Sequence, residues 1–315
     1  MTAPGYRPES LAQYRASYGE LRRNLGSPPA GVRTRDVSRM LRSGDPRYGF
    51  PTRDEMEAVD LDDVREFLSP ALAEAPIEIT VVGDFVEDDV LDAIAATMGA
   101  LPTRADSWPD YPESRNITFP EPTETPIVLT HNGGAEQALV NVYWPTTDDS
   151  DIHRSRVLRL LRAVLDLKLT ERLREAEAFT YSAASTNVES FYHPDYGYLY
   201  VGADIRAENI DRVYQTISLI AADMVNGEIT DDELLRARRP LIEQIQNAFE
   251  SNPVWLSWLS QSWTYPERLD RIRTITEDYS DITLDEIIDA ARTYMREDTA
   301  YRISIVPAAM DAAAE

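Results

Sequence analysis

The end of the chain repeats its beginning at an interval of about 223 residues. A short amphipathic helix pattern starts at Leu61, and an apolar alternation that predicts a strand follows at Ile77–Val82. The same order recurs as a helix pattern from Leu284 and an alternation at Tyr301–Val306. Leu284 lies 223 positions after Leu61, and Val306 lies 224 positions after Val82. Such a long and nearly constant interval is typical of a duplicated domain and not of a short-period solenoid.

The repeat extends upstream and predicts that the first copy is truncated. The helical pattern Leu11–Leu25 corresponds to Leu234–Phe249, and Asp45-Pro-Arg-Tyr corresponds to Tyr265-Pro-Glu-Arg. A unit of roughly 220 residues is therefore present about one and a half times. We expect Met1 to lie inside an ancestral repeat.

Composition indicates a globular protein with an acidic surface. The 315 residues are long enough for two domains, and 43% of them are hydrophobic, with five Trp and 16 Tyr. The formal net charge of −24 argues against nucleic acid and anionic membrane as partners, because phosphates are repelled by such a surface. A cationic or neutral peptide remains compatible with this charge.

No complete catalytic or metal-binding constellation is visible. The chain has no cysteine, which excludes disulfides, thiol nucleophiles and thiolate metal sites. Its histidines, His131, His153 and His193, are far apart, and the sequence contains no His-x-x-Glu-His motif. No apolar run approaches the ~18 residues that span a bilayer, so we predict no membrane insertion. We predict no catalytic residue and no metal ligand in this chain.

Proline density predicts the domain boundaries. Six prolines lie among polar residues between Leu101 and Pro126, a composition typical of a linker. We predict the C-terminal part of a truncated domain at residues 1–104, a linker at 105–125 and a complete domain at 126–315.

The second domain has the pattern of an α+β fold, with helices packed on one face of a mainly antiparallel sheet. The predicted order is two strands, a long helix, two strands, two or more helices and a final strand. The expected elements are strands at 127–130 and 138–144, a helix at 155–176, strands at 181–190 and 196–204, helices at 209–225 and 230–249, and a strand at 301–306.

One segment is more specific than these patterns. Leu173-Arg-Glu-Ala-Glu-Ala-Phe-Thr-Tyr-Ser182 resembles the Leu-Arg-Glu-x-x-Gly-x-x-Tyr-Ser signature of the pitrilysin/insulinase family of zinc peptidases. The resemblance covers essentially the whole chain and is strongest for the bacterial periplasmic branch. Other segments similar to the family, in the family's order, are Gly44-Asp-Pro-Arg-Tyr-Gly-Phe-Pro51, Val82-Gly-Asp-Phe85, Gly99-Ala-Leu-Pro102 and His131-Asn-Gly-Gly-Ala-Glu-Gln137.

The resemblance implies a fold of duplicated domains like those of mitochondrial processing peptidase, with the first repeat truncated here. It places the zinc motif in a catalytic half that this sequence lacks, so zinc is expected there and not in this chain. It implies that Arg174 and Tyr181 contact the backbone of a peptide substrate. Two positions depart from the signature, since Glu177 replaces a commonly apolar residue and Ala178 replaces the usual Gly.

The same residues have a purely structural interpretation. Arg174 would pair with Glu171 or Glu175 on a solvated helix end, and Tyr181 would pack within its strand. His131 is expected to hold a turn at the end of a strand. Trp255, Trp258 and Trp263 are expected in core or interdomain packing and not in a ligand cage, and an exposed subset of them would be available to contact the missing half.

Two functional hypotheses follow. In the first, the chain is the non-catalytic C-terminal part of a zinc metalloendopeptidase and encloses and orients a peptide or unfolded protein segment. Its partner is then an N-terminal catalytic half or a separate subunit with the zinc motif, and the resemblance implies a periplasmic location. In the second hypothesis, the chain is a stand-alone binding or assembly scaffold that uses the inactive peptidase fold.

Overall fold

The computed structural model describes residues 4–176 and 180–311, without the side chains of residues 174–176, 180, 181 and 311. The chain forms two compact units, each built from separate stretches of sequence. Unit 1 comprises residues 1–15, 54–111 and 242–276, and unit 2 comprises residues 16–53, 112–241 and 277–315. No helix in the described part of the chain is both long and apolar enough to cross a bilayer.

Each unit combines segments from both copies of the repeat. Unit 2 takes residues 16–53 from the first copy, and unit 1 takes residues 242–276 from the second. Residue 276 lies 223 positions after residue 53, so these two segments occupy matching places in the repeat. The two copies therefore exchange corresponding segments. The chain passes from unit 1 to unit 2 after Tyr111, which lies inside the predicted linker 105–125. The predicted domain boundaries at 104 and 126 concern the ancestral repeat and stay a prediction.

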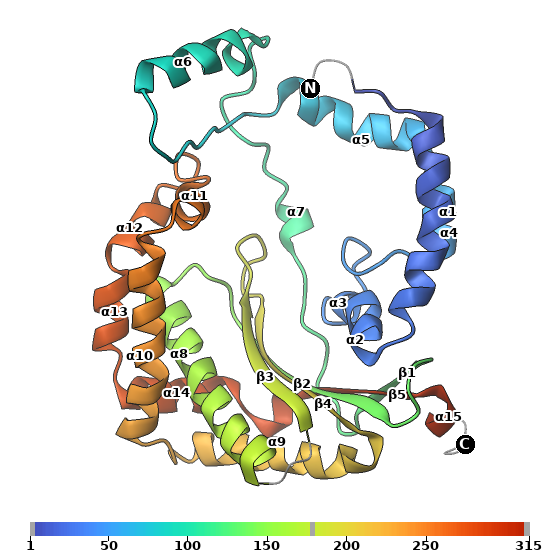
Figure 1. Ribbon diagram of the computed structural model, residues 1–315, viewed down its shortest axis with the longest axis vertical. Coiled ribbons are helices and arrows are strands. Elements are labelled where there is room, and N and C mark those ends of the chain that lie inside the picture. Colours follow the sequence, from blue (N-terminus) through green and yellow to red (C-terminus); the bar gives the residue numbers. More distant parts are fainter. Residues whose placement is uncertain (1–3, 177–179, 312–315) are drawn as a thin grey trace. The chain divides into compact units, whose positions relative to one another are not determined.

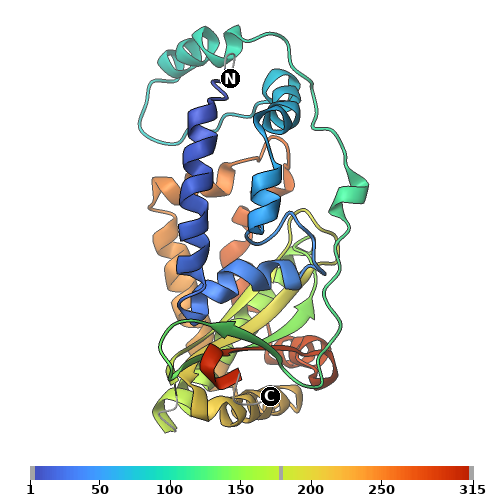
Figure 2. The same ribbon diagram turned by 90° about the vertical axis from the view of Figure 1, so that its right-hand side faces the viewer.

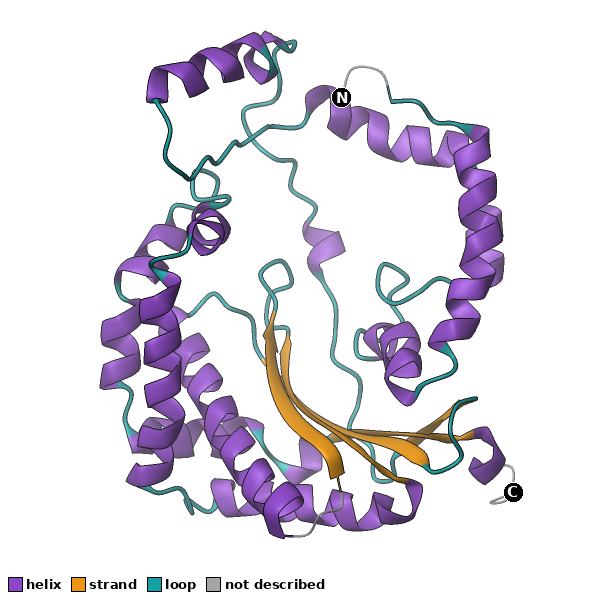
Figure 3. Cartoon of the chain, viewed as in Figure 1, coloured by secondary structure: helices purple, strands orange, loops and turns teal. Residues whose placement is uncertain are grey.

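Unit 2 contains a five-stranded sheet in the order β1-β5-β2-β4-β3 (Figures 1 and 3). β1 pairs with β5 in parallel, and the other three pairings are antiparallel. β5 is buried along its whole length, including its polar residues Arg302 and Ser304. The strands are β1 Ile127–His131, β2 Gln137–Thr146, β3 Thr180–Glu189, β4 Gly197–Arg206 and β5 Tyr301–Pro307.

Long amphipathic helices cover one face of this sheet, as predicted (Figure 1). They are α8 Ile152–Leu169, α9 Ile210–Val225 and α14 Leu284–Tyr294. Leu158, Leu161 and Leu165 of α8 recur at helical spacing and are almost completely buried, which follows from the apolar stripe in the sequence. The side chain of Asp151 caps α8 by accepting a hydrogen bond from the backbone of Arg154 at 3.0 Å. The fold is α+β.

Short helical segments cover part of the opposite face (Figure 2). They are α2 Pro29–Val32, the π-helical turn η1 Arg33–Val37 and α3 Ser38–Met40. Val32 and Val37 pack in one core cluster with Ile303 and Ile305 of β5. The exchanged segment 16–53 thus completes the core of the sheet, an arrangement that the sequence pattern does not predict.

The repeated helices have the same start signal in both copies. α5 Leu61–Glu74 and α14 each begin with a capping box, formed by Asp60 with Asp63 and by Thr283 with Glu286. Hydrogen bonds from the backbone and hydroxyl of Thr283, with one from His153, lower the pKa of Glu286 to about 2. These helices confirm the predicted starts.

The predicted strand at Ile77–Val82 is wrong. This segment, drawn as loop between α5 and α6 in Figure 3, belongs to no ladder of the described residues. Its apolar alternation matches that of β5. Such an alternation shows only that the segment favours an extended conformation. A strand also needs hydrogen-bonded neighbours, and unit 1 contains no sheet among its described residues.

Unit 1 also has very little apolar core. Among the described residues, the buried hydrophobic side chains lie in unit 2, with the exception of Ile245. Unit 1 exposes Phe67, Ile79, Val81 and Trp263 instead. Its elements besides α5 are α6 Glu87–Ala96, η2 Met98–Ala100, α11 Asn252–Leu259 and α12 Glu267–Arg273.

The remaining elements are shorter or contribute residues to both units. Unit 2 also contains α7 Pro112–Arg115, η3 Thr170–Ala176, η4 Ala207–Asn209, η5 Glu297–Thr299 and α15 Ala308–Asp311. The elements that contribute to both units are α1 Pro8–Leu25, α4 Arg53–Ala58, α10 Asp231–Ala248 and α13 Ile275–Asp281.

The same substitution at matching positions of the two copies should change the stability of the protein by very different amounts. Ile303 is 0% exposed and its counterpart Ile79 is 43% exposed. We expect Ile303→Ala to lower the free energy of unfolding by about 2–5 kcal/mol, because it leaves a cavity in a packed core. Ile79→Ala should change it by less than about 1 kcal/mol. Urea unfolding followed by circular dichroism measures both, and equal losses would contradict this account of the two copies.

Candidate functional site

The two predicted substrate-binding residues lie on either side of one helix-to-strand connection. Arg174 belongs to the π-helical turn η3 that extends α8, and Tyr181 lies near the start of β3. Glu177 and Ala178, where the sequence departs from the family signature, lie outside the described residues, as do the side chains of Arg174 and Tyr181. The backbone thus places both residues at the same end of the α8–β3 pair.

Tyr181 lies at an irregular point of an edge strand. Within the described sheet β3 is an edge strand paired with β4, and the register shifts between Thr180 and Ser182. Such a bulge redirects the side chains around it, and bulges are frequent at sheet edges and next to binding sites. The other edge of β3 has no strand neighbour among the described residues.

Small exposed side chains follow Tyr181 along β3. Ser182, Ala184 and Thr186 are exposed, whereas Ser185 between them is buried. The hydroxyl of Ser185 donates to the carboxylate of Asp166 in α8 at 2.7 Å, so Ser185 faces the long helices. Since neighbouring residues of a strand point to opposite faces, Ser182, Ala184 and Thr186 lie on the other face. We call these three residues the open strip.

A tyrosine cluster lies beside the open strip on the same face. Thr186 is paired with Tyr200, which is paired in turn with Tyr143. The rings of Tyr143 and Tyr200 are stacked with centroids 5.0 Å apart, and the Arg33 guanidinium lies 5.6 Å from the centre of the Tyr200 ring. Burial raises the pKa of Tyr200, although the charge of Arg33 opposes the rise. These phenols therefore stay neutral near pH 7 and offer hydrogen bonds instead of charge.

The charged residues around Arg174 already have partners. Arg236 donates to the carboxylate of Glu171 at 2.9 Å, and Arg172 donates to Asp223 at 2.5 Å. Glu171 is one of the two residues that the structural interpretation of the sequence predicts as an ion-pair partner of Arg174. Its pairing with Arg236 weakens that alternative, while the Glu175 side chain lies outside the described ones.

His131 has the predicted structural role. It is 1% exposed, its Nδ1 accepts from the backbone N–H of Gly133 at 3.0 Å, and its Nε2 lies 2.8 Å from the carbonyl oxygen of Gln137. The neutral ring with its proton on Nε2 satisfies both contacts. His131 therefore holds the turn between β1 and β2.

The other two histidines also have local partners. His153 pairs with Glu286 at 2.6 Å, and Nδ1 of His193 lies 2.8 Å from the carbonyl oxygen of Arg115. Among the described residues, no group of three or more His, Asp or Glu side chains is arranged to hold a metal ion. The donor groups described here do not fit a zinc site.

The tryptophans divide into two kinds. Trp255 and Trp258 pack with Phe249, with ring centroids 5.3–5.7 Å apart, and are only partly buried, so they form a local aromatic cluster and not a core. Trp263 is instead 88% exposed, so its predicted place in a core is wrong. The backbone N–H of Trp263 donates to the carboxylate of Glu78 at 2.9 Å, which fixes the loop while its indole remains in solvent.

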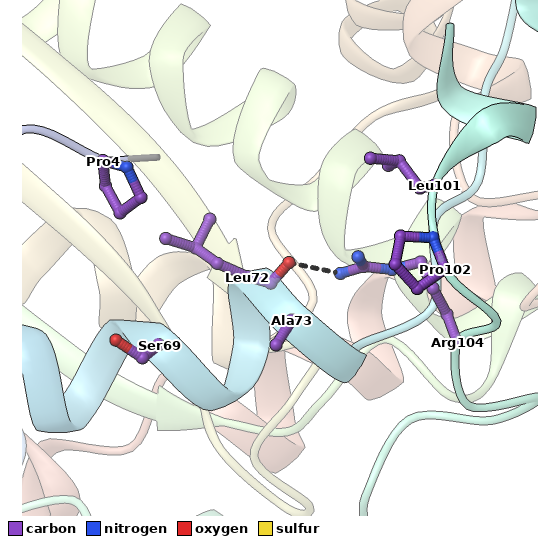
Figure 4. A pocket seen from close by; sticks show the side chains of 7 residues that line it. All are labelled: Pro4, Ser69, Leu72, Ala73, Leu101, Pro102 and Arg104. Atoms are coloured by element: carbon purple, nitrogen blue, oxygen red, sulfur yellow. Dashed lines mark hydrogen bonds between the residues drawn. The ribbon is translucent and has the colours of Figure 1, made fainter. Parts of the chain in front are cut away.

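Unit 1 contains a cavity of about 400 Å³ between α5 and the segment after η2 (Figure 4). Leu72, Leu101 and Pro102 form much of its wall. Arg104 points to the end of α5 and donates to the carbonyl oxygens of Ala71 and Leu72, both at 3.0 Å. The Leu72 carbonyl is one of those that a helix end leaves without a backbone partner, whereas the Ala71 carbonyl also accepts from the backbone N–H of Ala75 at 3.1 Å. Arg104 thus has a capping role, and the residues lining the cavity include no acid–base pair.

Comparisons with known proteins identify relatives of this fold. A family model described as the peptidase M16 inactive domain matches residues 58–241, more than half of the chain. No curated protein matches the chain.

Solved structures of similar fold come from several bacteria. A protease from Helicobacter pylori has a TM-score of 0.78 at 16% identity, over 96% of this chain and 73% of that one. A peptidase M16 inactive domain from Pseudomonas fluorescens has a TM-score of 0.75 at 17% identity, over 96% and 71%. The periplasmic protease PqqL from Escherichia coli has a TM-score of 0.71 at 14% identity, over 94% of this chain but only 32% of its own. Identities this low show a common fold alone.

Replacement by alanine should affect stability differently at two adjacent glycines of the turn that His131 holds. A Cβ on Gly133 would lie 2.4 Å from the carbonyl oxygen of Ser27, whereas the nearest atom to a Cβ on Gly134 is 3.5 Å away. We expect Gly133→Ala to lower the free energy of unfolding by about 1–3 kcal/mol, because the backbone must shift. Gly134→Ala should lower it by less than about 1 kcal/mol. If thermal unfolding gave the reverse order, the described turn would be incorrect.

Proposed function

The chain belongs to the M16 peptidase family, the pitrilysin/insulinase family that its motifs resemble, and from this we propose that it encloses and orients a peptide for a zinc site held elsewhere. The observation that carries the proposal is the match to the family's inactive domain over residues 58–241, which includes Arg174 and Tyr181. In this role the chain binds substrate and performs no bond cleavage itself.

The surroundings of Arg174 and Tyr181 support a peptide-binding role. The open strip begins next to Tyr181, and its small side chains leave room for an extended peptide along the edge of the sheet. The neutral phenols of the tyrosine cluster and the Arg33 guanidinium border this strip. The net charge of −24 favours cationic or neutral peptides over acidic ones.

Arg174 and Tyr181 have different chemical roles in this proposal. A guanidinium donates charge-assisted hydrogen bonds to a peptide carbonyl or carboxylate, each worth about 1.5–3 kcal/mol. A phenol directed at the oxygen that becomes negative during peptide hydrolysis stabilises the transition state. Both groups act on the substrate and leave the activation of water to the zinc-bearing partner.

The partner and the compartment are parts of the same proposal. We place the zinc and the general base on a polypeptide segment with the His-x-x-Glu-His motif, either an N-terminal catalytic half or a separate subunit. The neighbour PqqL is described as a periplasmic protease, which supports the same compartment here.

The proposal predicts activity only in a mixture. The purified chain should contain no stoichiometric zinc and should not cleave a quenched fluorescent peptide library. Addition of the zinc-motif polypeptide encoded in the same genome should produce zinc-dependent cleavage. Arg174→Ala and Tyr181→Phe should each reduce kcat/KM in the mixture by roughly ten- to a hundredfold, with unchanged zinc content.

Nearby residues provide matched controls. Arg172 lies in the same turn as Arg174 but pairs with Asp223, and Tyr192 lies in an exposed turn. Arg172→Ala and Tyr192→Phe should therefore retain the activity of the mixture. Zinc-dependent cleavage by the chain alone, lost on Arg174→Ala, would contradict the proposal. Peptide binding without any cleavage in the mixture would favour the scaffold hypothesis.

A further inference from the structure

One guanidinium beside the open strip has no carboxylate partner among the described side chains. The side chain of Arg33 makes a single hydrogen bond with the described residues, in which its Nη1 donates to the hydroxyl oxygen of Tyr200. The carboxylate nearest to it in sequence, that of Asp36, is paired with Arg35 at 2.6 Å. In a chain with 55 acidic and 31 basic residues, Arg33 thus keeps a positive charge that no described side chain neutralises.

Tyr200 places this guanidinium next to the middle of the open strip. A Cβ on Gly202 would lie 2.7 Å from the Tyr200 hydroxyl, so the phenol reaches over Gly202. Gly202 is paired with Ala184, the central residue of the strip. Paired residues of neighbouring strands lie side by side on one face. The Arg33 guanidinium at the end of the phenol therefore lies beside Ala184, where only small side chains separate it from the strip.

The guanidinium is held in place and retains free donors. Val32 and Val37, on either side of Arg33 along the chain, are buried in the core cluster and fix the backbone of η1. A guanidinium has five N–H donors, and the bond to Tyr200 uses one. Arg33 is partly exposed, and its Nε and Nη2 are not among the buried atoms that lack a partner, so they reach solvent. Such a fork of donors matches the two oxygens of a carboxylate.

A charge of the opposite sign lies nearer to Tyr181. Asp204 is paired with Ser182 and accepts a hydrogen bond from its hydroxyl at 2.9 Å. Along β4 it lies two residues from Gly202, a distance of about 7 Å. A carboxylate on a bound peptide is therefore repelled beside Ser182 and attracted at the guanidinium. The open strip thus distinguishes one position for a carboxylate from its neighbour.

We propose that Arg33 binds one carboxylate of the peptide substrate beside Ala184 and selects peptides that carry this group. The carboxylate belongs to an Asp or Glu side chain or to the peptide C-terminus, because both present the same two oxygens. The inference rests on the proposed function for the presence of a peptide on the strip. It deepens that proposal by naming the substrate class. Since the net charge of −24 disfavours acidic peptides, this class is neutral or cationic peptides with one carboxylate at a fixed position.

Matched peptide pairs test the proposal in the mixture with the zinc-motif polypeptide. The two quenched fluorescent peptides of each pair differ in one carboxylate, either C-terminal acid against amide or Glu against Gln at one position. With the native chain, one pair should show roughly tenfold higher kcat/KM for the member with the carboxylate. Arg33→Met should remove this difference and leave cleavage of the neutral member almost unchanged. The pair that responds identifies the source of the carboxylate.

Two further variants separate recognition of substrate from a structural role. Arg33→Glu should reverse the preference in the responding pair, so that the neutral member becomes the better substrate. A loss of packing alone does not produce such a reversal. Arg35 lies in the same helical turn but is paired with Asp36, so Arg35→Met should keep the native preference.

Binding of the same peptides to the purified chain, measured by fluorescence anisotropy, separates this inference from the proposed function. Cleavage in the mixture without any pair that distinguishes the native chain from Arg33→Met would overturn the inference alone. Binding that favours the carboxylate member and loses this preference in Arg33→Met, without cleavage in the mixture, would overturn the proposed function alone. Absence of both binding and cleavage would overturn both.

Discussion

The pairing of β5 on both sides is the constraint on which unit 2 depends. β5 joins β1 in parallel and β2 antiparallel, and all seven of its residues are buried. The residues that flank it in space come from distant parts of the chain, including the exchanged segment 16–53. The core on this face of the sheet therefore combines the second copy of the repeat with a segment of the first.

The same constraint explains the difference between the units. Unit 1 has counterparts of α14, of β5 and of the exchanged helical segment, but its described residues include no strand that pairs with 77–82. Its apolar side chains consequently remain exposed. These exposed side chains therefore do not contribute the free energy of about 25 cal/mol per Å² that burial of apolar surface provides.

Local signals in the sequence predicted most of unit 2. The start of the helix at Leu284 and the apolar spacing of α8 are set within one or two helical turns, so single-sequence reasoning recovers them. The failure at Ile77–Val82 has the opposite origin, because strand pairing depends on residues far away in sequence. The exchange of segments 16–53 and 242–276 between the two units could not be predicted either, because it also depends on contacts between distant parts of the sequence. At the site, Arg174 and Tyr181 came from a resemblance, and only the register of β3 and β4 revealed the open strip.

The central claim is that the sheet face beside Tyr181 binds peptide. The most direct measurement is photo-crosslinking in the mixture with the zinc-motif polypeptide, with p-benzoylphenylalanine in place of Ala184 and, in a separate variant, in place of Leu219. Ala184 lies in the open strip, and Leu219 lies on the helical face. The account predicts that substrate peptide is labelled from position 184 and not from position 219. Labelling from position 219 alone, or equal labelling from both, would contradict it.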